Sequence, residues 1–138
     1  MNQHPSVLFI VEQGGYPIFA DELQREGLHV QTAMSMRKAL ALLKSGRPDV
    51  IIAEFNYGTQ FRDRISNLEP LLARVQTDHR EARVIVLLDR DHQPHLDRLA
   101  SRFPIFDVIY FPVESQHLQA SIRRAADARR SAESAAPS

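Results

Sequence analysis

The feature that most constrains the fold of this chain is a series of five short apolar runs spread along its length. They cover residues Val7–Val11, Leu28–Thr32, Val50–Ala53, Val84–Leu88 and Val108–Phe111. Several of these runs are nearly continuous Val, Ile and Leu, with no alternation between apolar and polar residues. Continuous apolarity is typical of strands that are buried on both faces, as in a parallel sheet. We therefore expect five buried, parallel strands.

Segments with the periodicity of an amphipathic helix follow each run. The first is expected to begin at Pro17 and to end at Gly27, because proline is favoured in the first turn of a helix and glycine just past its end. The second is expected to be capped by Ser35 and to end at Gly46. The two remaining boundaries predicted from such signals are Pro94 for the fourth helix and Ser115, as a cap, for the fifth.

The third helical segment carries the clearest apolar stripe, at spacings of three and four residues. The stripe consists of Phe61, Ile65, Leu68, Leu72 and Val75. Pro70 lies inside it, and proline in a helix interior removes a hydrogen bond and clashes with the preceding turn. We therefore expect either a kink or two consecutive helices here.

The order of elements is strand then helix, repeated five times. Parallel strands need helical crossovers, which are almost always right-handed, so the expected product is a doubly wound, three-layer α/β sandwich. Such folds place their functional edge at the carboxyl ends of the strands. One domain is predicted over residues 1–130, and residues 131–138 are small and polar, which favours a flexible tail or the start of a linker.

Composition excludes several classes of function. Lys and Arg total 17 and Asp and Glu total 17, so the chain lacks the summed positive field that attracts nucleic acids or anionic membranes. It contains no cysteine, which excludes disulfides, thiolate zinc sites and cysteine nucleophiles and fits a reducing compartment. The first residues lack a secretory signal, and the apolar runs are too short to span a bilayer. We expect a soluble, cytoplasmic protein that binds neither nucleic acid nor membrane.

Three stretches resemble the receiver domains of bacterial two-component response regulators. Residues 22–33 resemble the first helix and second strand of a receiver, and residues 39–54 resemble its second helix and third strand. Phe111-Pro112-Val113, followed by Leu118, has the spacing of the Lys-Pro-Phe signature and of the helix after it. The resemblance spans about Val7 to Arg124. It implies a flavodoxin-like five-stranded parallel sheet in the order 2-1-3-4-5, and a cis peptide bond before Pro112.

The resemblance also implies a phosphorylation site, from which this chain departs at nearly every position. The first strand is followed by Glu12 alone, where receivers carry a pair of acids that holds Mg²⁺. Glu54 stands at the phosphoacceptor aspartate, Leu88 at the hydroxyl position, Phe111 at the lysine position and Val108 at the aromatic switch position. We interpret the phosphorylation pocket as degenerate.

The loss of the lysine does not depend on alignment. The only lysines are Lys38 and Lys44, both in or at the end of the second helix. A phosphoryl group at Glu54 would therefore meet apolar side chains without a counter-charge, and burying an unpaired anion is prohibitive. We interpret Glu54 as a solvated or locally hydrogen-bonded carboxylate rather than as a mimic of the phosphorylated state. With Glu12 it is a weak candidate for a cation site, and no other metal or cofactor is expected.

Two further clusters have simple interpretations. His92 and His95 lie near Asp89 and Asp91 with loose spacing, and Pro94 lies between the two histidines, which favours a solvated loop over a metal site. Gly14-Gly15 follows the first strand without the further residues of a phosphate-binding loop, which favours a flexible turn.

These observations predict a pseudo-receiver that is not an enzyme and that acts as an adaptor for a protein partner, with a homodimer as one form of such binding. In receivers the fourth and fifth helices commonly form the partner face. The residues expected there are Arg98, Arg102, His117, Arg123 and Arg124. The third helix is the other candidate surface.

Three alternatives stay open from the sequence. One is a phosphorelay regulator that accepts phosphate at Glu54 or elsewhere. Another is a small-ligand sensor with an apolar pocket made by Val11, Leu88 and Phe111. The third is a regulatory domain of a longer effector, with a linker that starts near Ala132.

Overall fold

The structure is a computed structural model that describes residues 5–11, 17–55 and 68–135. Strands and helices alternate along it as β1 (Ser6–Ile10), α1 (Pro17–Arg25), β2 (His29–Ala33), α2 (Met36–Ser45), β3 (Val50–Glu54), α3 (Glu69–Asp78), β4 (Arg83–Leu88), the single-turn 3-10 helix η1 (Arg90–His92), α4 (Gln93–Ala100), β5 (Asp107–Tyr110) and α5 (Ser115–Ala135). All five predicted strands are confirmed, with ends that differ by a residue or so from the apolar runs.

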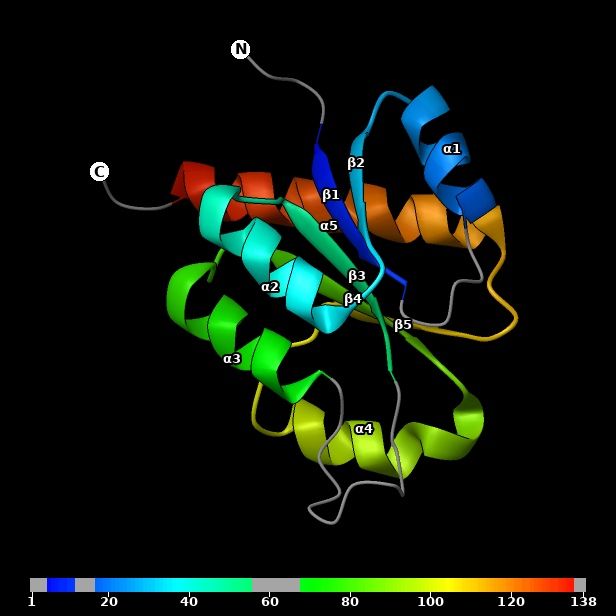
Figure 1. Cartoon of the computed structure of the whole chain (residues 1–138), viewed down its shortest axis with the longest axis vertical. Coiled ribbons are helices and arrows are strands. Elements are labelled where there is room, and N and C mark those ends of the chain that lie inside the picture. Colours follow the sequence, from blue (N-terminus) through cyan, green and yellow to red (C-terminus); the bar gives the residue numbers. More distant parts are fainter. Residues whose placement is uncertain (1–4, 12–16, 56–67, 136–138) are drawn as a thin grey trace.

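The strands form one parallel sheet in the order β2-β1-β3-β4-β5. Helices α2, α3 and α4 cover one face of the sheet, and α1 and α5 cover the other (Figure 1). This is the three-layer, doubly wound sandwich with the strand order that the resemblance implied. The fold prediction is confirmed.

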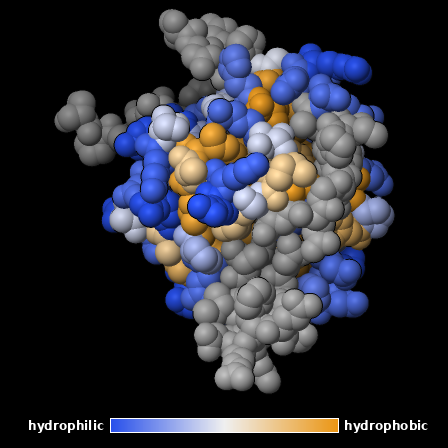
Figure 2. All heavy atoms as spheres, in the orientation of Figure 1, coloured by the Kyte–Doolittle hydropathy of each residue, from blue (hydrophilic) through white to orange (hydrophobic). Residues whose placement is uncertain are grey.

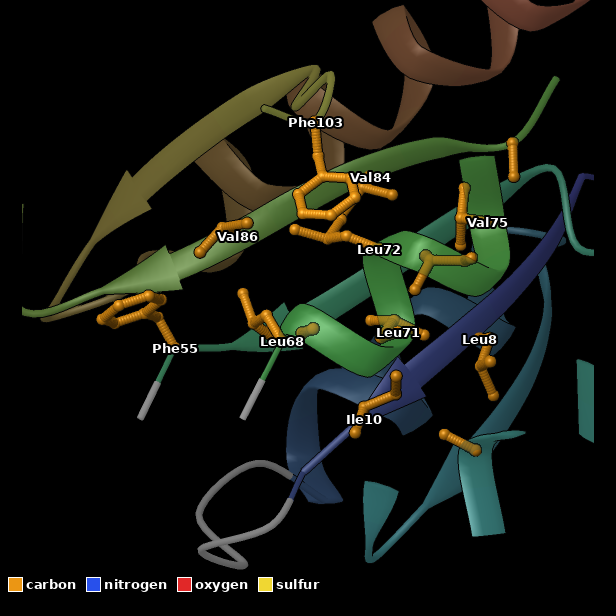
Figure 3. Close-up of a cluster of buried hydrophobic side chains, with 14 of the residues drawn as sticks. Leu8, Ile10, Phe55, Leu68, Leu71, Leu72, Val75, Val84, Val86 and Phe103 are labelled. Carbon is orange, nitrogen blue, oxygen red and sulfur yellow. The ribbon is translucent and has the colours of Figure 1, made fainter. Parts of the chain in front are cut away.

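Each face of the sheet packs its own apolar core. On one face, α3 directs Leu71, Leu72 and Val75 toward side chains of β1 and β4, such as Leu8 and Val84 (Figure 3). The core on the other face contains, from α5, the buried side chains Leu118, Ile122, Ala125 and Ala126. Because β3 lies between two strands and under both helical layers, its five residues are all buried, which explains the unbroken apolar sequence of its first four residues.

The prediction that every strand is buried on both faces is wrong for β2. Only Ala33 of this strand is buried, and His29, Gln31 and Thr32 are exposed. The strand order places β2 at an edge of the sheet, where one side has no neighbouring strand. Its more polar sequence is consistent with that position.

Most helix boundaries follow the predicted signals. The Ser35 hydroxyl accepts a hydrogen bond from the Lys38 amide at 3.1 Å, and α2 ends at Gly46. Gly27 follows α1 with a φ of 89°, a conformation that favours glycine, and Pro94 lies in the first turn of α4. Ser115 is the first residue of α5 rather than its cap, because the Leu118 amide donates to the carbonyl of Glu114.

Two helices differ in extent from the prediction. Pro70 lies in the first turn of α3, where proline is tolerated, so the described part of this helix has no proline in its interior. Phe61 and Ile65, the first members of the predicted stripe, lie outside the described residues. At the other end of the chain, α5 continues to Ala135 and so enters the segment that was expected to be a tail. Among the described helices, none is long and apolar enough to cross a membrane.

Candidate functional site

The carboxyl edge of the sheet brings together the positions that the sequence singled out on β3, β4 and β5. The Phe55 amide donates to the Leu87 carbonyl at 2.9 Å, and the Phe111 amide donates to the Leu88 carbonyl at 3.0 Å. Glu54, Leu88 and Phe111 therefore lie at the ends of three neighbouring strands. Glu12, their expected partner after β1, lies outside the described residues.

Glu54 is buried. Only 5% of its surface is exposed, so the interpretation as a solvated carboxylate is wrong. The reason is its place on β3, the middle strand of the sheet, which helices cover on both faces. Burial of a charged carboxylate is costly unless the group is hydrogen-bonded or paired, and local hydrogen bonding of Glu54 stays a prediction.

The β4 residue beside Glu54 is Leu87 rather than Leu88. Glu54 and Leu87 are partners in the register of the parallel pair, and side chains alternate between the two faces of a strand. Leu87 belongs to the core under α5, and Leu88 belongs to the core under α2, α3 and α4. Both side chains have no exposed surface, and neither carries a hydrogen-bonding group.

Phe111 and Val108, which the resemblance assigned to the lysine and switch positions, are also apolar. Phe111 is half-buried and packs against the core under α5, and Val108 packs against the opposite core. The peptide bond between Phe111 and Pro112 is cis, as the resemblance implied. Lys38 and Lys44 are exposed on α2. Glu54 is thus a buried carboxylate at the end of β3 whose partner in register, Leu87, is apolar.

The described residues contain no cluster of three or more His, Asp or Glu side chains that could hold a metal ion. His92 and His95 are close, with ring centroids 6.2 Å apart, and the His92 ring lies 6.2 Å from that of Phe55. The Asp89 carboxylate accepts a hydrogen bond from the Asp91 amide at 3.0 Å and so caps η1. Asp89 therefore acts as the capping residue of a turn, in agreement with the loop interpretation.

The five residues expected on a partner face are all exposed, and whether they bind a partner stays a prediction. Arg102 pairs with Glu69 of α3 at 2.9 Å. Arg123 pairs with Glu26, just after α1, at 3.3 Å, whereas the adjacent Arg124 pairs with Asp107 of β5 at 2.8 Å. Arg98 lies on α4 and His117 in the first turns of α5, both exposed. The ion pairs therefore direct the arginines toward three different elements.

A hydrogen-bonded chain between β5 and α4 was not predicted. The Tyr110 hydroxyl donates to the Gln93 side-chain oxygen at 2.5 Å, and the Gln93 side-chain nitrogen donates to Asp97 at 2.8 Å. The Arg90 guanidinium lies over the Tyr110 ring, 4.2 Å from its centroid, a distance at which a cation is attracted to the ring. The signal in the sequence was a tyrosine within the apolar run Val108–Phe111, since a half-buried hydroxyl needs a partner.

Several solved structures have a similar fold. The chemotaxis response regulator CheY4 of Vibrio cholerae superposes with a TM-score of 0.71 at 22% identity, over 88% of this chain and 98% of that one. The signal receiver domain of a putative LuxO repressor protein from Vibrio parahaemolyticus gives 0.76 at 15% identity, over 98% and 99%. This chain has the receiver fold.

A third similar structure is NtrX from Brucella abortus in complex with ATP, with a TM-score of 0.78 at 20% identity. The match covers 94% of this chain but only 28% of NtrX, so the receiver fold here corresponds to a part of that longer protein. No protein-family profile matches the sequence, and no curated protein is significantly similar to it.

Proposed function

We propose that this chain is a pseudo-receiver, an adaptor that binds a protein partner without a phosphorylation switch and that catalyses no reaction. The observation that carries the proposal is the apolar character of the carboxyl edge. Leu87, Leu88 and Phe111 occupy the positions where a receiver would contact the phosphoryl oxygens, and both leucines have no exposed surface.

The energetic argument concerns the phosphoryl group itself. A phosphoryl group on Glu54 would add a charge of about −1.5 to −2 and three strong hydrogen-bond acceptors. The described side chains nearest in register supply neither a cation nor a hydroxyl donor. A buried phosphoryl group needs such partners, so we expect the unphosphorylated form to be the working form.

The contact between β5 and α4 supports the same proposal. In this chain Tyr110 is hydrogen-bonded to Gln93 and stacked under Arg90. These contacts connect the central sheet to α4 through side chains that do not lie at Glu54. The surface formed by α4, β5 and α5 is thus expected to keep one conformation, which favours constitutive binding over switching.

Charge is expected to determine the choice of partner. On the face shown in Figure 2, the described apolar areas are small and are bordered by hydrophilic side chains. The arginines on α4 and α5 are exposed and would add favourable contacts to an acidic partner, chiefly by accelerating and orienting the encounter. A second copy of the chain is the simplest alternative occupant.

The test is a titration with Mg²⁺ and then beryllofluoride, a mimic of the phosphoryl group, followed by NMR of the labelled chain. The control is a response regulator with the full set of site residues, treated in the same way. We expect no saturable shifts at Glu54, Leu87, Leu88 or Phe111. Saturable shifts at these residues that spread to α4 and α5 would overturn the proposal in favour of a phosphorelay protein.

A further inference from the structure

A groove of about 560 Å³ opens near the amino ends of β4 and β5, at the edge of the sheet opposite to Glu54. The last turns of α3, the start of β4 and the connection from α4 to β5 form its walls, and these segments lie at one end of the molecule (Figure 1). Its volume is in the range of pockets that hold small molecules or peptide side chains, roughly 300–1,000 Å³.

The floor and one wall of the groove are apolar. Val75 and Val84 are almost fully buried below it, and Figure 3 shows both beside Phe103 in the core. Ile105 and Phe106 form a wall in the connection before β5. Phe106 is 37% exposed and is one of two large apolar residues that the described chain leaves in contact with solvent. An exposed aromatic beside a preformed apolar hollow is typical of a binding hot spot.

The charged residues that line the groove are both cationic. Arg80 and Arg83 line it, and no Asp or Glu does. Arg83 is half-buried, and the described residues place no carboxylate within ion-pair distance of its guanidinium. Arg80 uses one nitrogen to donate to the Gln76 carbonyl at 3.2 Å and makes no ion pair among these residues. Two guanidinium groups are thus available to an anion at the rim of an apolar hollow.

Positive charge continues on the other side of the C-terminal end of α3. A second hollow of about 530 Å³ there is lined by Lys44, Arg47, Arg74 and His79. Its one acid, Asp78, already pairs with Arg74 at 3.1 Å. Cations near the C-terminal ends of α2 and α3 also stabilise these helices by interacting with the helix dipoles. That explanation does not apply to Arg83, which lies on a strand.

We propose that the first groove binds an acidic peptide segment of a partner protein. An aromatic or large aliphatic side chain of the segment lies against Val75, Val84 and Phe106, and flanking carboxylates bind Arg80 and Arg83. The combination of apolar burial with guanidinium–carboxylate bonds selects acidic segments over neutral ones. The groove lies at the amino edge of the sheet, opposite to Glu54, so the proposal stands or fails independently of the state of the carboxyl edge.

The test uses the whole chain, labelled with ¹⁵N, and the capped peptide Glu-Glu-Phe-Glu-Glu as the probe. We expect saturable shifts of the amides of Arg83, Val84 and Phe106. Replacing the four glutamates by glutamine, or the phenylalanine by alanine, should weaken binding by about tenfold or more, since a charge-assisted bond or a buried ring contributes more than about 1.4 kcal/mol.

Substitutions in the chain test whether the peptide binds in the groove. Arg83→Gln and Phe106→Ser should each weaken binding by about tenfold, with Arg80→Gln, at an exposed position, as a second charge variant if Arg83→Gln unfolds. Arg37→Gln, on the exposed side of α2, is the matched control and should leave the affinity unchanged.

Three outcomes would overturn the proposal. The first is the absence of saturable shifts up to millimolar peptide, and the second is binding that these three groove variants do not weaken. The third is equally tight binding of 2-naphthoate, an aromatic carboxylate without a peptide backbone, which would assign the groove to a small molecule instead.

Discussion

The two edges of the sheet differ in how they accommodate charged side chains. At the carboxyl edge, where such folds place their chemistry, Leu88 has no exposed surface and Glu54 is 5% exposed. At the amino edge, Asp49 accepts a hydrogen bond from the Ser6 amide at 2.8 Å and pairs with Arg129 at 3.2 Å. The ends of β3 and β4 at the carboxyl edge are packed as core, with the hydrogen-bonded chain of Tyr110, Gln93 and Asp97 beside them. The amino edge holds an ion-paired network and a groove.

The difference bears on the cost of polar groups in a packed site. A buried polar network is stable only if all its members are satisfied. The side chains of Leu87, Leu88 and Phe111 pack as part of the two cores, so a single polar group placed among them would lack partners. The comparison predicts that polar substitutions are costly at the carboxyl edge and that loss of charge has smaller effects at the amino edge.

The largest effect is expected for Leu88→Thr. The change restores a hydroxyl but leaves it in a fully buried site and removes part of the apolar side chain, so the free energy of unfolding should fall by about 2–4 kcal/mol. Urea denaturation measures it, with Val30→Thr on the half-exposed edge strand β2 as the control, at a cost below about 1 kcal/mol. A loss at position 88 as small as that of the control would mean that this edge is an open pocket after all.

The fold could be predicted from the sequence because each of its signals is local. The apolar runs identified the strands, and Ser35 and Gly46 identified the ends of α2 through backbone rules that apply wherever such residues occur. The strand order came from the resemblance, and similar solved structures have the same receiver fold.

The candidate site could be predicted only in part, because its geometry depends on register. Val84–Leu88 is apolar at every position, so its sequence does not mark which side chains face α5, and Leu87 rather than Leu88 lies beside Glu54. The arginine contacts depend on residues far away in the chain, since Arg123 and Glu26 are 97 residues apart. The groove at the amino edge joins α3 to the connection before β5, which no local pattern indicates.

The second effect in size is expected for Arg129→Gln. The guanidinium lies 3.2 Å from Asp49 and 3.5 Å from Glu81, and only 18% of its side chain is exposed. Solvent screens such a pair less than a surface pair, so the substitution should lower the free energy of unfolding by about 1–2 kcal/mol. The loss should shrink in high salt. A loss that salt does not change would assign the role of Arg129 to packing of its aliphatic stem.

Tyr110→Phe should cost about 1 kcal/mol, the net contribution of one hydrogen bond. The ring and its contact with Arg90 remain, and only the bond to Gln93 is lost. Hydrogen exchange should show faster opening of α4, with α2 unchanged as the internal control. Unchanged exchange in α4 would mean that the apolar contacts of Leu96 and Leu99 hold this helix without the tyrosine.

Arg123→Gln is expected to have the smallest effect, below about 0.5 kcal/mol, because an exposed ion pair contributes little. The side chains of Arg123 and Glu26 are 67% and 47% exposed, and their atoms lie 3.3 Å apart. Arg124→Gln is the matched comparison on the next residue, since its partner Asp107 is only 26% exposed and also accepts a hydrogen bond from the buried Ser121 hydroxyl at 2.6 Å. Thermal unfolding of the two variants side by side should show the larger loss for Arg124, because its removal leaves a less exposed carboxylate with one partner fewer. The reverse order would mean that the ion pair between Arg123 of α5 and Glu26, just after α1, contributes more to stability than its exposure implies.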